Sequence, residues 1–238
     1  GHVDPEHHIV KTKHRSSSLL LERFFKLPAG GSASILTDFA NPLKKQDSAH
    51  AQQIYAFDEI VNAKRFEIEN ECITTIATQQ PIMARDLRLL ASILEVAAEL
   101  ERMGDYAKGI ATICVRIGKH QHIKPLIDIP RMAELSVNML HRSVGAFVRG
   151  DAETAMQIPG EDDQVDFLYN QVYRELVTIM FGNPATIDQA NYLMWVAHNL
   201  ERVADRVTNI CERTIYTQTG ELKEIDTSDD ESRLATNE

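Results

Sequence analysis

The sequence predicts an all-α protein made of two repeated three-helix bundles, and three observations support this. Apolar residues recur at three- and four-residue steps over long stretches, which is the period of amphipathic helices. Strand signals are missing, because the chain has no sustained alternation of apolar and polar residues and no Asn-Gly or Asp-Gly hairpin turn. The pattern Leu-Glu-Arg-x-x-Asp occurs twice, at residues 100–105 and 200–205, which indicates an internal duplication.

Composition points to a folded cytoplasmic protein. With 238 residues, 43% of them hydrophobic, the chain can bury a core as one large domain or two small ones. The sequence has no run of about 18 apolar residues and no signal-peptide segment near its start, which argues against a membrane span or secretion. A net charge of -10 opposes nucleic-acid binding. Cys72, Cys114 and Cys211 are too far apart for a disulfide framework and are predicted to be buried.

The first half of the chain contains one interrupted segment and two long helices. We expect residues 1–15 to be a disordered segment or an expression remnant, and residues 16–119 to form the first bundle. Glycine and proline between residues 28 and 42 interrupt the first helix of that bundle. The next helices are predicted over residues 46–78 and 83–118, separated by Pro81 and ended by Gly118.

The second half, predicted as residues 120–218, repeats this arrangement after a loop over residues 120–130. Glycine and proline punctuate its helices, because glycine favours the left-handed conformation that ends a helix and proline cannot continue one. The polar residues 219–238 are predicted to form a disordered acidic tail. The predicted helices cover residues 131–149, 161–181 and 186–217, with Gly150, Gly182-Asn183-Pro184 and Gly220 as their stops.

The repeated motif places two acidic side chains on one face of each helix. At about 100° per residue, Glu101 and Asp105 lie within about 40° of each other and opposite the apolar residues of the same helix. In the second copy Glu201 and Asp205 do the same, and Asn209 continues the stripe. Both acidic stripes are therefore predicted to face outward.

These stripes need a neutralising partner. Carboxylates four residues apart repel each other by roughly 0.2–0.5 kcal/mol per pair. A metal ion is one solution, since carboxylate oxygens are ligands for Mg²⁺, Mn²⁺ and iron. The simpler alternative is an exposed ion pair with Arg102 and Arg202, worth at most about 1 kcal/mol. His198, on the second stripe, is interpreted as a surface histidine in a local ion pair rather than a ligand.

Further acids favour the metal hypothesis. Asp162 and Asp166 form a third pair in the helix before the second motif, and the first half offers Asp58 and Asn62 at the corresponding place. If these helices run antiparallel, four carboxylates of the second half converge. Asn62 and Gly109 make the first half poorer in ligands.

These residues resemble the PhoU family of phosphate-uptake regulators. The resemblance runs from about residue 47 to residue 216 and rests on the segments Asp58–Asn62, Gln80–Arg88, Leu100–Ala107 and Leu200–Ile210. It implies two three-helix bundles with metal clusters on their outward faces. By position, the metal-binding acids of the family fall on Glu101, Asp105, Asp162, Asp166, Glu201 and Asp205, and Asp58 also matches.

The resemblance also implies a regulator rather than an enzyme. Members of the family repress phosphate-starvation signalling by linking the ATPase of the Pst phosphate transporter to a membrane sensor histidine kinase. The expected partners are therefore that ATPase and the kinase, with a homodimer as the expected assembly and membrane contact through partner proteins only. The expected cofactor is a divalent metal ion, iron first, with zinc, manganese, magnesium or nickel as alternatives.

Two other functions stay open from the sequence. A carboxylate-bridged metalloenzyme would use the acids to activate water or O₂. Sites of that kind lie inside a helical bundle and include Glu-x-x-His ligands, whereas these acids are predicted to face outward. A purely structural scaffold would leave the acidic stripes solvated or paired with arginine.

Overall fold

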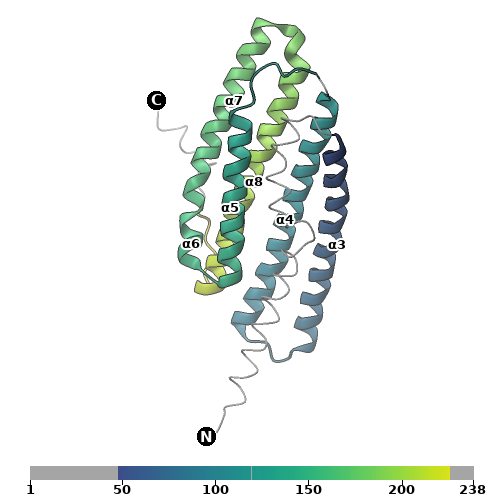
Figure 1. Cartoon of the computed structure of the whole chain (residues 1–238). Helices are drawn as coiled ribbons and strands as arrows, with labels where there is room; N and C mark the ends of the chain where they lie inside the picture. Colours follow the sequence, from purple (N-terminus) through teal and green to yellow (C-terminus); the bar gives the residue numbers. More distant parts are fainter. Residues whose placement is uncertain (1–47, 119, 226–238) are drawn as a thin grey trace.

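The computed structural model describes residues 48–118 and 120–225, and every regular element in them is helical (Figure 1). The absence of strands from these residues confirms the all-α prediction. The predicted first helix of the first bundle and the tail beyond residue 225 lie outside the described residues. The elements are α3 (Ser48–Thr78), α4 (Ala84–Ile117), α5 (Asp128–Arg149), α6 (Ala152–Gln157), η1 (Pro159–Glu161), α7 (Asp162–Gly182), η2 (Pro184–Thr186) and α8 (Ile187–Thr219).

In the first half, α3 and α4 form an antiparallel hairpin whose turn contains Pro81. The predicted stop at Gly118 is confirmed, since α4 ends at Ile117 and the amide of Gly118 donates to the carbonyl of Cys114. Gly118 has a φ of 56°, which a residue with a side chain rarely adopts.

The second half differs from the prediction at its start. Helix α5 begins at Asp128 rather than at Arg131, so Pro130 lies in the first helical turn. A proline is tolerated there, because the amides of the first turn have no partner within the helix. The predicted stop at Gly150 is confirmed, with a φ of 65°.

The short helix α6 was not predicted. Asp151 caps its N-terminus by accepting hydrogen bonds from the amide and the hydroxyl of Thr154, at 3.0 and 2.6 Å. Its six residues are too few to display a helical period in the sequence. A capping side chain is the only local signal for such an element.

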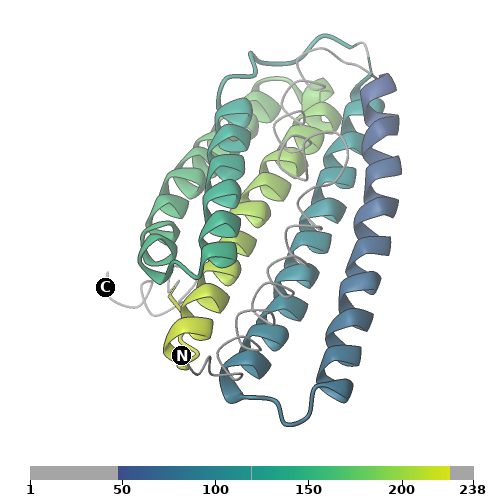
Figure 2. The same cartoon turned by 60° about the horizontal axis from the view of Figure 1, so that its bottom comes forward.

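The two helices that carry the repeated motif form the centre of the molecule. Helices α4 and α8 run antiparallel and pack against each other, with α3 on the far side of α4 and α5 and α7 beside α8 (Figure 2). Gly109 allows a close approach, because a Cβ atom there would lie 3.4 Å from Nδ2 of Asn199. Buried Leu100 and Met103 of α4, and Leu200 and Val203 of α8, contribute to one continuous core.

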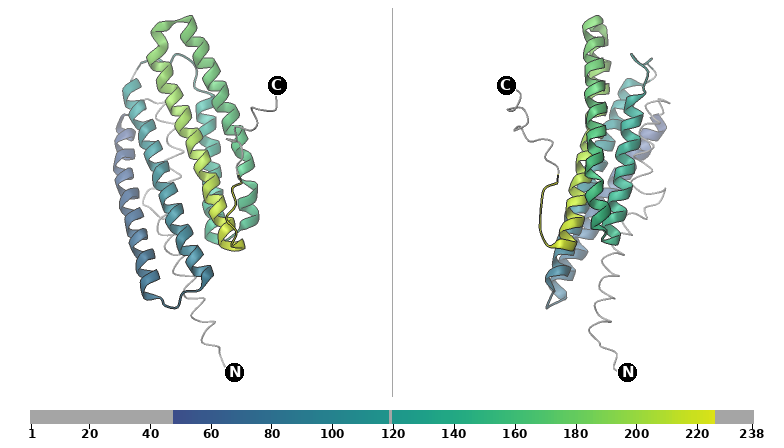
Figure 3. Two further views of the ribbon diagram at one scale, coloured as in Figure 1. Left: turned by 180° about the vertical axis from the view of Figure 1, so that it is seen from behind. Right: turned by 90° about the vertical axis from the view of Figure 1, so that its left-hand side faces the viewer.

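The described start of the tail folds back along the C-terminal part of α8 (Figure 3). The amide of Ile225 donates to Oε1 of Glu212 at 2.8 Å, which holds residues 221–225 beside the helix. No described helix contains a segment that is both long and apolar enough to cross a membrane.

The three cysteines are buried, as predicted. Burial raises the pKa of Cys72 to about 11 and the pKa values of Cys114 and Cys211 to about 12. The thiolate form is disfavoured in each case, because burial removes the water that would solvate its charge.

Candidate functional site

The second motif lies on α8 with its acids partly exposed, as predicted. The side chains of Glu201 and Asp205 are 21% and 24% exposed. Each has a basic neighbour on its own helix: Oε2 of Glu201 lies 3.3 Å from Nδ1 of His198, and Oδ2 of Asp205 lies 2.9 Å from Nη1 of Arg202. The predicted local contact between His198 and a neighbouring acid is present, and Arg202 pairs with the aspartate of its own motif.

Helix α7 brings Asp162 and Asp166 to the same side of the second half. The ring centroids of Tyr169 and His198 lie 6.1 Å apart, which fixes the register of the antiparallel pair α7 and α8. Asp166 is three residues before Tyr169, and Glu201 is three residues after His198. Asp162 is seven residues before Tyr169, and Asp205 is seven residues after His198. The register therefore places Asp166 opposite Glu201, and Asp162 opposite Asp205, so that the four acids form two facing levels.

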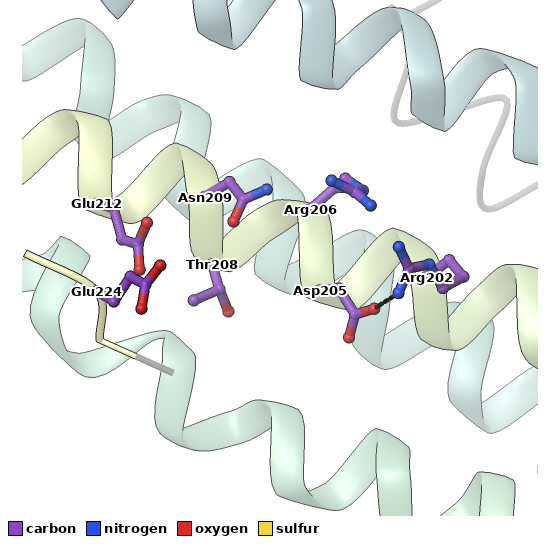
Figure 4. Close-up of a pocket in the computed structure, with 7 residues that line it drawn as sticks. All are labelled: Arg202, Asp205, Arg206, Thr208, Asn209, Glu212 and Glu224. Atoms are coloured by element: carbon purple, nitrogen blue, oxygen red, sulfur yellow. Dashed lines mark ion pairs between the residues drawn. The ribbon is translucent and has the colours of Figure 1, made fainter. Parts of the chain in front are cut away.

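The chemistry of this donor set fits a hard divalent cation, which prefers carboxylate oxygens. Within residues 48–118 and 120–225, however, no three His, Cys, Asp or Glu side chains are gathered closely enough to hold one metal ion. Figure 4 shows why Asp205 does not contribute in this arrangement, since its carboxylate points to Arg202. The predicted ligand set stays a prediction.

A pocket of about 240 Å³ lies further along the same helix (Figure 4). It is lined by Asp205 and Asn209, which the sequence predicted as site residues, and by Glu212 and Glu224, which the sequence did not indicate. Glu224 comes from the segment that folds back along α8, and only the tertiary fold brings it to this face. The lining residues are Arg202, Asp205, Arg206, Thr208, Asn209, Glu212 and Glu224.

The first motif, on α4, has a different set of partners. Oε1 of Glu101 lies 3.8 Å from Nη1 of Arg65 on α3, and Asp105 is exposed. Arg102 does not pair with Asp105, which makes that alternative wrong for the first half. It instead donates to Oε1 of the buried residue Glu99 at 2.6 Å.

Glu99 also links the two halves of the molecule. Its second carboxylate oxygen lies 3.5 Å from Nη1 of Arg206 on α8. A buried carboxylate needs such compensation, because its desolvation is costly without charge-assisted hydrogen bonds. Arg102 and Arg206 therefore neutralise a single acid from two helices.

Asp58 is the most enclosed of the first-half acids that the structure describes, with 3% of its surface exposed. Nζ of Lys108 donates to Oδ2 of Asp58 at 2.7 Å, and Nδ2 of Asn62 lies 3.4 Å from the same oxygen. The hydrogen bond and charge of Asp58 raise the pKa of Lys108, so the ammonium form is favoured. An ammonium group of the chain itself therefore already balances the charge of the Asp58 carboxylate.

An aromatic surface, formed by Tyr169, Tyr173, Trp195 and His198, adjoins the acids of the second half. Trp195 is 62% exposed, and its ring meets His198 edge to face with a centroid distance of 6.4 Å. Tyr169 and Tyr173 are four residues apart on α7 and therefore share one face. Trp195 therefore lies at the surface of α8 and not in the core.

Taken together, the fold and the acidic faces define an all-helical protein with a duplicated Glu-x-x-x-Asp helix, in which the two copies form the central pair. A family model described as the PhoU domain matches residues 30–114 and again residues 129–214. The chain belongs to the PhoU family. The two matches contain one motif helix each, which confirms the duplication inferred from the sequence.

Similar proteins have the same family name. A phosphate-specific transport system accessory protein PhoU homolog from Clostridium acetobutylicum is 36% identical over 192 residues, covering 81% of this chain and 87% of that protein. The PhoU protein of Escherichia coli is 35% identical and covers 76% of this chain and 75% of its own length. The crystal structure of PhoU from Pseudomonas aeruginosa has a TM-score of 0.76 at 29% identity, covering 91% of this chain and 98% of that one.

Proposed function

We propose that this chain is an accessory regulator of phosphate transport that acts as an adaptor between the ATPase of the phosphate transporter and a sensor histidine kinase. Membership of the PhoU family carries this proposal, together with relatives named as accessory proteins of the phosphate-specific transport system. An adaptor of this kind would work in the cytoplasm, where a transporter ATPase hydrolyses ATP, and would reach the membrane through its partners.

The aromatic surface supports an adaptor role, because exposed tryptophan and tyrosine side chains are frequent anchors of protein interfaces. Trp195 and Tyr173 are both exposed, and Glu201 lies beside the same surface. Aromatic rings next to carboxylates suit a partner segment that carries arginine, which can stack on a ring and donate to an acid. The net charge of -10 favours encounter with such a basic segment.

The adaptor role is tested by measuring binding of the full chain to the purified ATPase and to the cytoplasmic part of the kinase. The Trp195→Ala substitution should weaken binding to one of them by roughly 30-fold, the effect of an interface anchor worth about 2 kcal/mol. Phe167→Ala is the matched control, since Phe167 is 69% exposed but lies on a different face of α7. Failure of the wild-type chain to bind either partner would refute the adaptor role.

We also propose that the second half binds a divalent cation, iron first among the candidates, between α7 and α8. Asp162, Asp166, Glu201 and Asp205 supply hard oxygen donors at two facing levels, and Asn209 extends the set. Arg202 and His198 contact two of these acids, but surface pairs of this kind are worth at most about 1 kcal/mol. A divalent cation can displace them, and it would supply charge that joins the two helices.

Elemental analysis of protein purified without chelator tests the cation. Metal should be present and should be lost in the Glu201→Gln/Asp205→Asn variant, with zinc, manganese, magnesium or nickel as alternatives to iron. Glu134→Gln/Asn138→Asp is a suitable control, because it alters two exposed polar residues of α5, one turn apart, without changing the charge of the chain. Metal-free wild-type protein would contradict this part of the proposal.

Two further properties belong to the same proposal. The chain is expected to form a homodimer, which light scattering of the purified full chain can measure directly. It is also expected to regulate without catalysing a reaction. Metal-dependent turnover of phosphoesters or O₂ that disappears with Asp205→Asn would instead support a metalloenzyme.

A further inference from the structure

The two halves also differ at the residue three positions after the motif aspartate. In the first half this residue is Lys108, whose ammonium nitrogen lies 2.7 Å from Oδ2 of Asp58. The side chain of Lys108 is 43% exposed, whereas that of Asp58 is 4% exposed, so the ammonium reaches inward from the surface of α4 to a carboxylate on α3. The charge of Asp58 is thus neutralised by another residue of the same chain.

The duplication identifies the equivalent residue of the second half. Because Asp105 corresponds to Asp205, the position of Lys108 corresponds to Thr208. Thr208 is 2% exposed, and its hydroxyl oxygen is buried without a hydrogen-bond partner in the described structure. It also lines the pocket beside Asp205 (Figure 4). A neutral oxygen therefore stands in the second half where a cation stands in the first.

An ammonium group and a metal ion both bind to the negatively charged oxygens of a carboxylate. Each supplies positive charge at close range, and two cations that share one carboxylate repel each other strongly when little water separates them. Asn62 adds to the exclusion, because its amide nitrogen faces the same Oδ2 atom at 3.4 Å. A metal ion at Asp58 would have to displace both groups.

We propose that Lys108 is a resident cation that takes the place of a metal ion in the first half, so that this chain binds metal only in its second half. This inference rests on the proposed metal binding of the second half. Asp58 is then neutralised by a residue of the chain and not by a bound ion. Lys108 is therefore a specificity-determining residue, because it decides which half binds metal.

Manganese binding to the full chain tests the inference. Wild-type protein and variants are loaded with Mn²⁺, separated from free ion by gel filtration, and analysed for bound metal. The Glu201→Gln/Asp205→Asn variant should lose its Mn²⁺, because the first half has no competent site. Glu101→Gln/Asp105→Asn, which alters the equivalent acids of the first half, should retain the wild-type amount.

A second set of variants asks whether Lys108 is the cause. In the Glu201→Gln/Asp205→Asn background, the further changes Lys108→Thr and Asn62→Asp give the first half the residue types of the second at these two positions. This combination should bind Mn²⁺ in an amount comparable to wild type, and Mn²⁺ should raise its melting temperature by several degrees. In the Glu201→Gln/Asp205→Asn background, the Lys108→Arg change keeps a cation at Asp58, and this variant should bind no Mn²⁺.

The outcomes separate the two proposals. If wild-type protein binds no Mn²⁺, the proposed metal site of the second half fails, and gain of Mn²⁺ on replacing Lys108 still decides the role of the lysine. If the Glu201→Gln/Asp205→Asn variant keeps Mn²⁺ that Glu101→Gln/Asp105→Asn removes, the first half binds metal and the inference is wrong. A folded Lys108→Thr/Asn62→Asp variant that gains no Mn²⁺ overturns it equally.

Loss of the lysine is expected to affect folding as well, because it leaves Asp58 buried without its ammonium partner. The Lys108→Met/Asp58→Asn variant guards against this problem, since it removes both charges together. It should fold and should show no change in melting temperature with Mn²⁺ in the second-half-deficient background. A Mn²⁺-dependent shift in that variant would place the ion away from Asp58 and would count against the inference.

Discussion

Replacement of Gly104 by alanine tests how closely α3 and α4 pack beside the first motif. A Cβ atom on Gly104 would lie 3.7 Å from Oδ1 of Asp58 and 3.7 Å from Cγ1 of Val61, which is ordinary van der Waals contact. The duplication supports the same substitution, because the equivalent residue of the second half is Ala204, which is buried. We expect Gly104→Ala to stabilise the protein.

The magnitude follows from two contributions. Alanine is favoured over glycine in a helix interior by about 0.8–1 kcal/mol. A methyl group contributes about 0.8 kcal/mol when fully buried, and Gly104 is partly buried, so roughly half of that applies. The sum of about 1.3 kcal/mol corresponds to a rise in melting temperature of roughly 3–5 °C for a chain of this size.

Circular dichroism on heating and urea unfolding would measure the effect, with two control glycines. Gly109→Ala should gain less, because its Cβ would lie 3.4 Å from Nδ2 of Asn199. Gly220→Ala should destabilise by about 1 kcal/mol, since Gly220 has a φ of 79°. A loss of stability in Gly104→Ala would refute the spacing of α3 and α4 described here.

Three further predictions concern the core, the response to acid and the cysteines. Leu176→Ala, at a fully buried position, should lower the free energy of unfolding by about 2–5 kcal/mol in urea titrations, whereas Phe181→Ala, 86% exposed, should change it by less than about 0.5 kcal/mol. The hydrogen bond from Lys124 lowers the pKa of Glu175, so the stability from this pair is complete above the ordinary value of 4.5 and is lost as the pH falls through the lower folded-state pKa. Lys124→Met should therefore show a weaker loss of stability between pH 5 and pH 3, and an unchanged acid response would contradict that assignment. Because the pKa values of Cys72, Cys114 and Cys211 are about 11 to 12, native protein at pH 8 should react slowly with a thiol reagent, and fast labelling before unfolding would show that the thiols are accessible.

The long helices were predictable because they repeat one period many times and end at residues with special backbone preferences. Helix α4 has 34 residues and ends before Gly118, whose positive φ favours glycine. Short or marginal features were not predictable in this way. The first turn of α5 contains Pro130, which suits both a loop and a helix start, and α6 has only six residues.

The candidate site shows a similar division between local and tertiary information. The helical period correctly placed Glu201 and Asp205 on a partly exposed face, because that placement depends on one helix only. The partner of Arg102 could not be found from spacing, since Glu99 and Asp105 are both three residues away from it. Packing against α8 determines that Arg102 pairs with Glu99, because this packing buries Glu99 and brings Arg206 to it.

The ion pairs of the two motif copies differ in whether they join separate helices. In the first half, two acids are neutralised by cations on a neighbouring helix: Asp58 by Lys108 between α3 and α4, and Glu101 by Arg65 across the same pair. Such contacts join separate helices and therefore contribute to packing. In the second half, the two pairs observed on α8 lie within that single helix. A pair within one helix is an exposed contact worth at most about 1 kcal/mol, so the proposed cation of the second half would compete with weaker contacts than a cation at the buried Asp58.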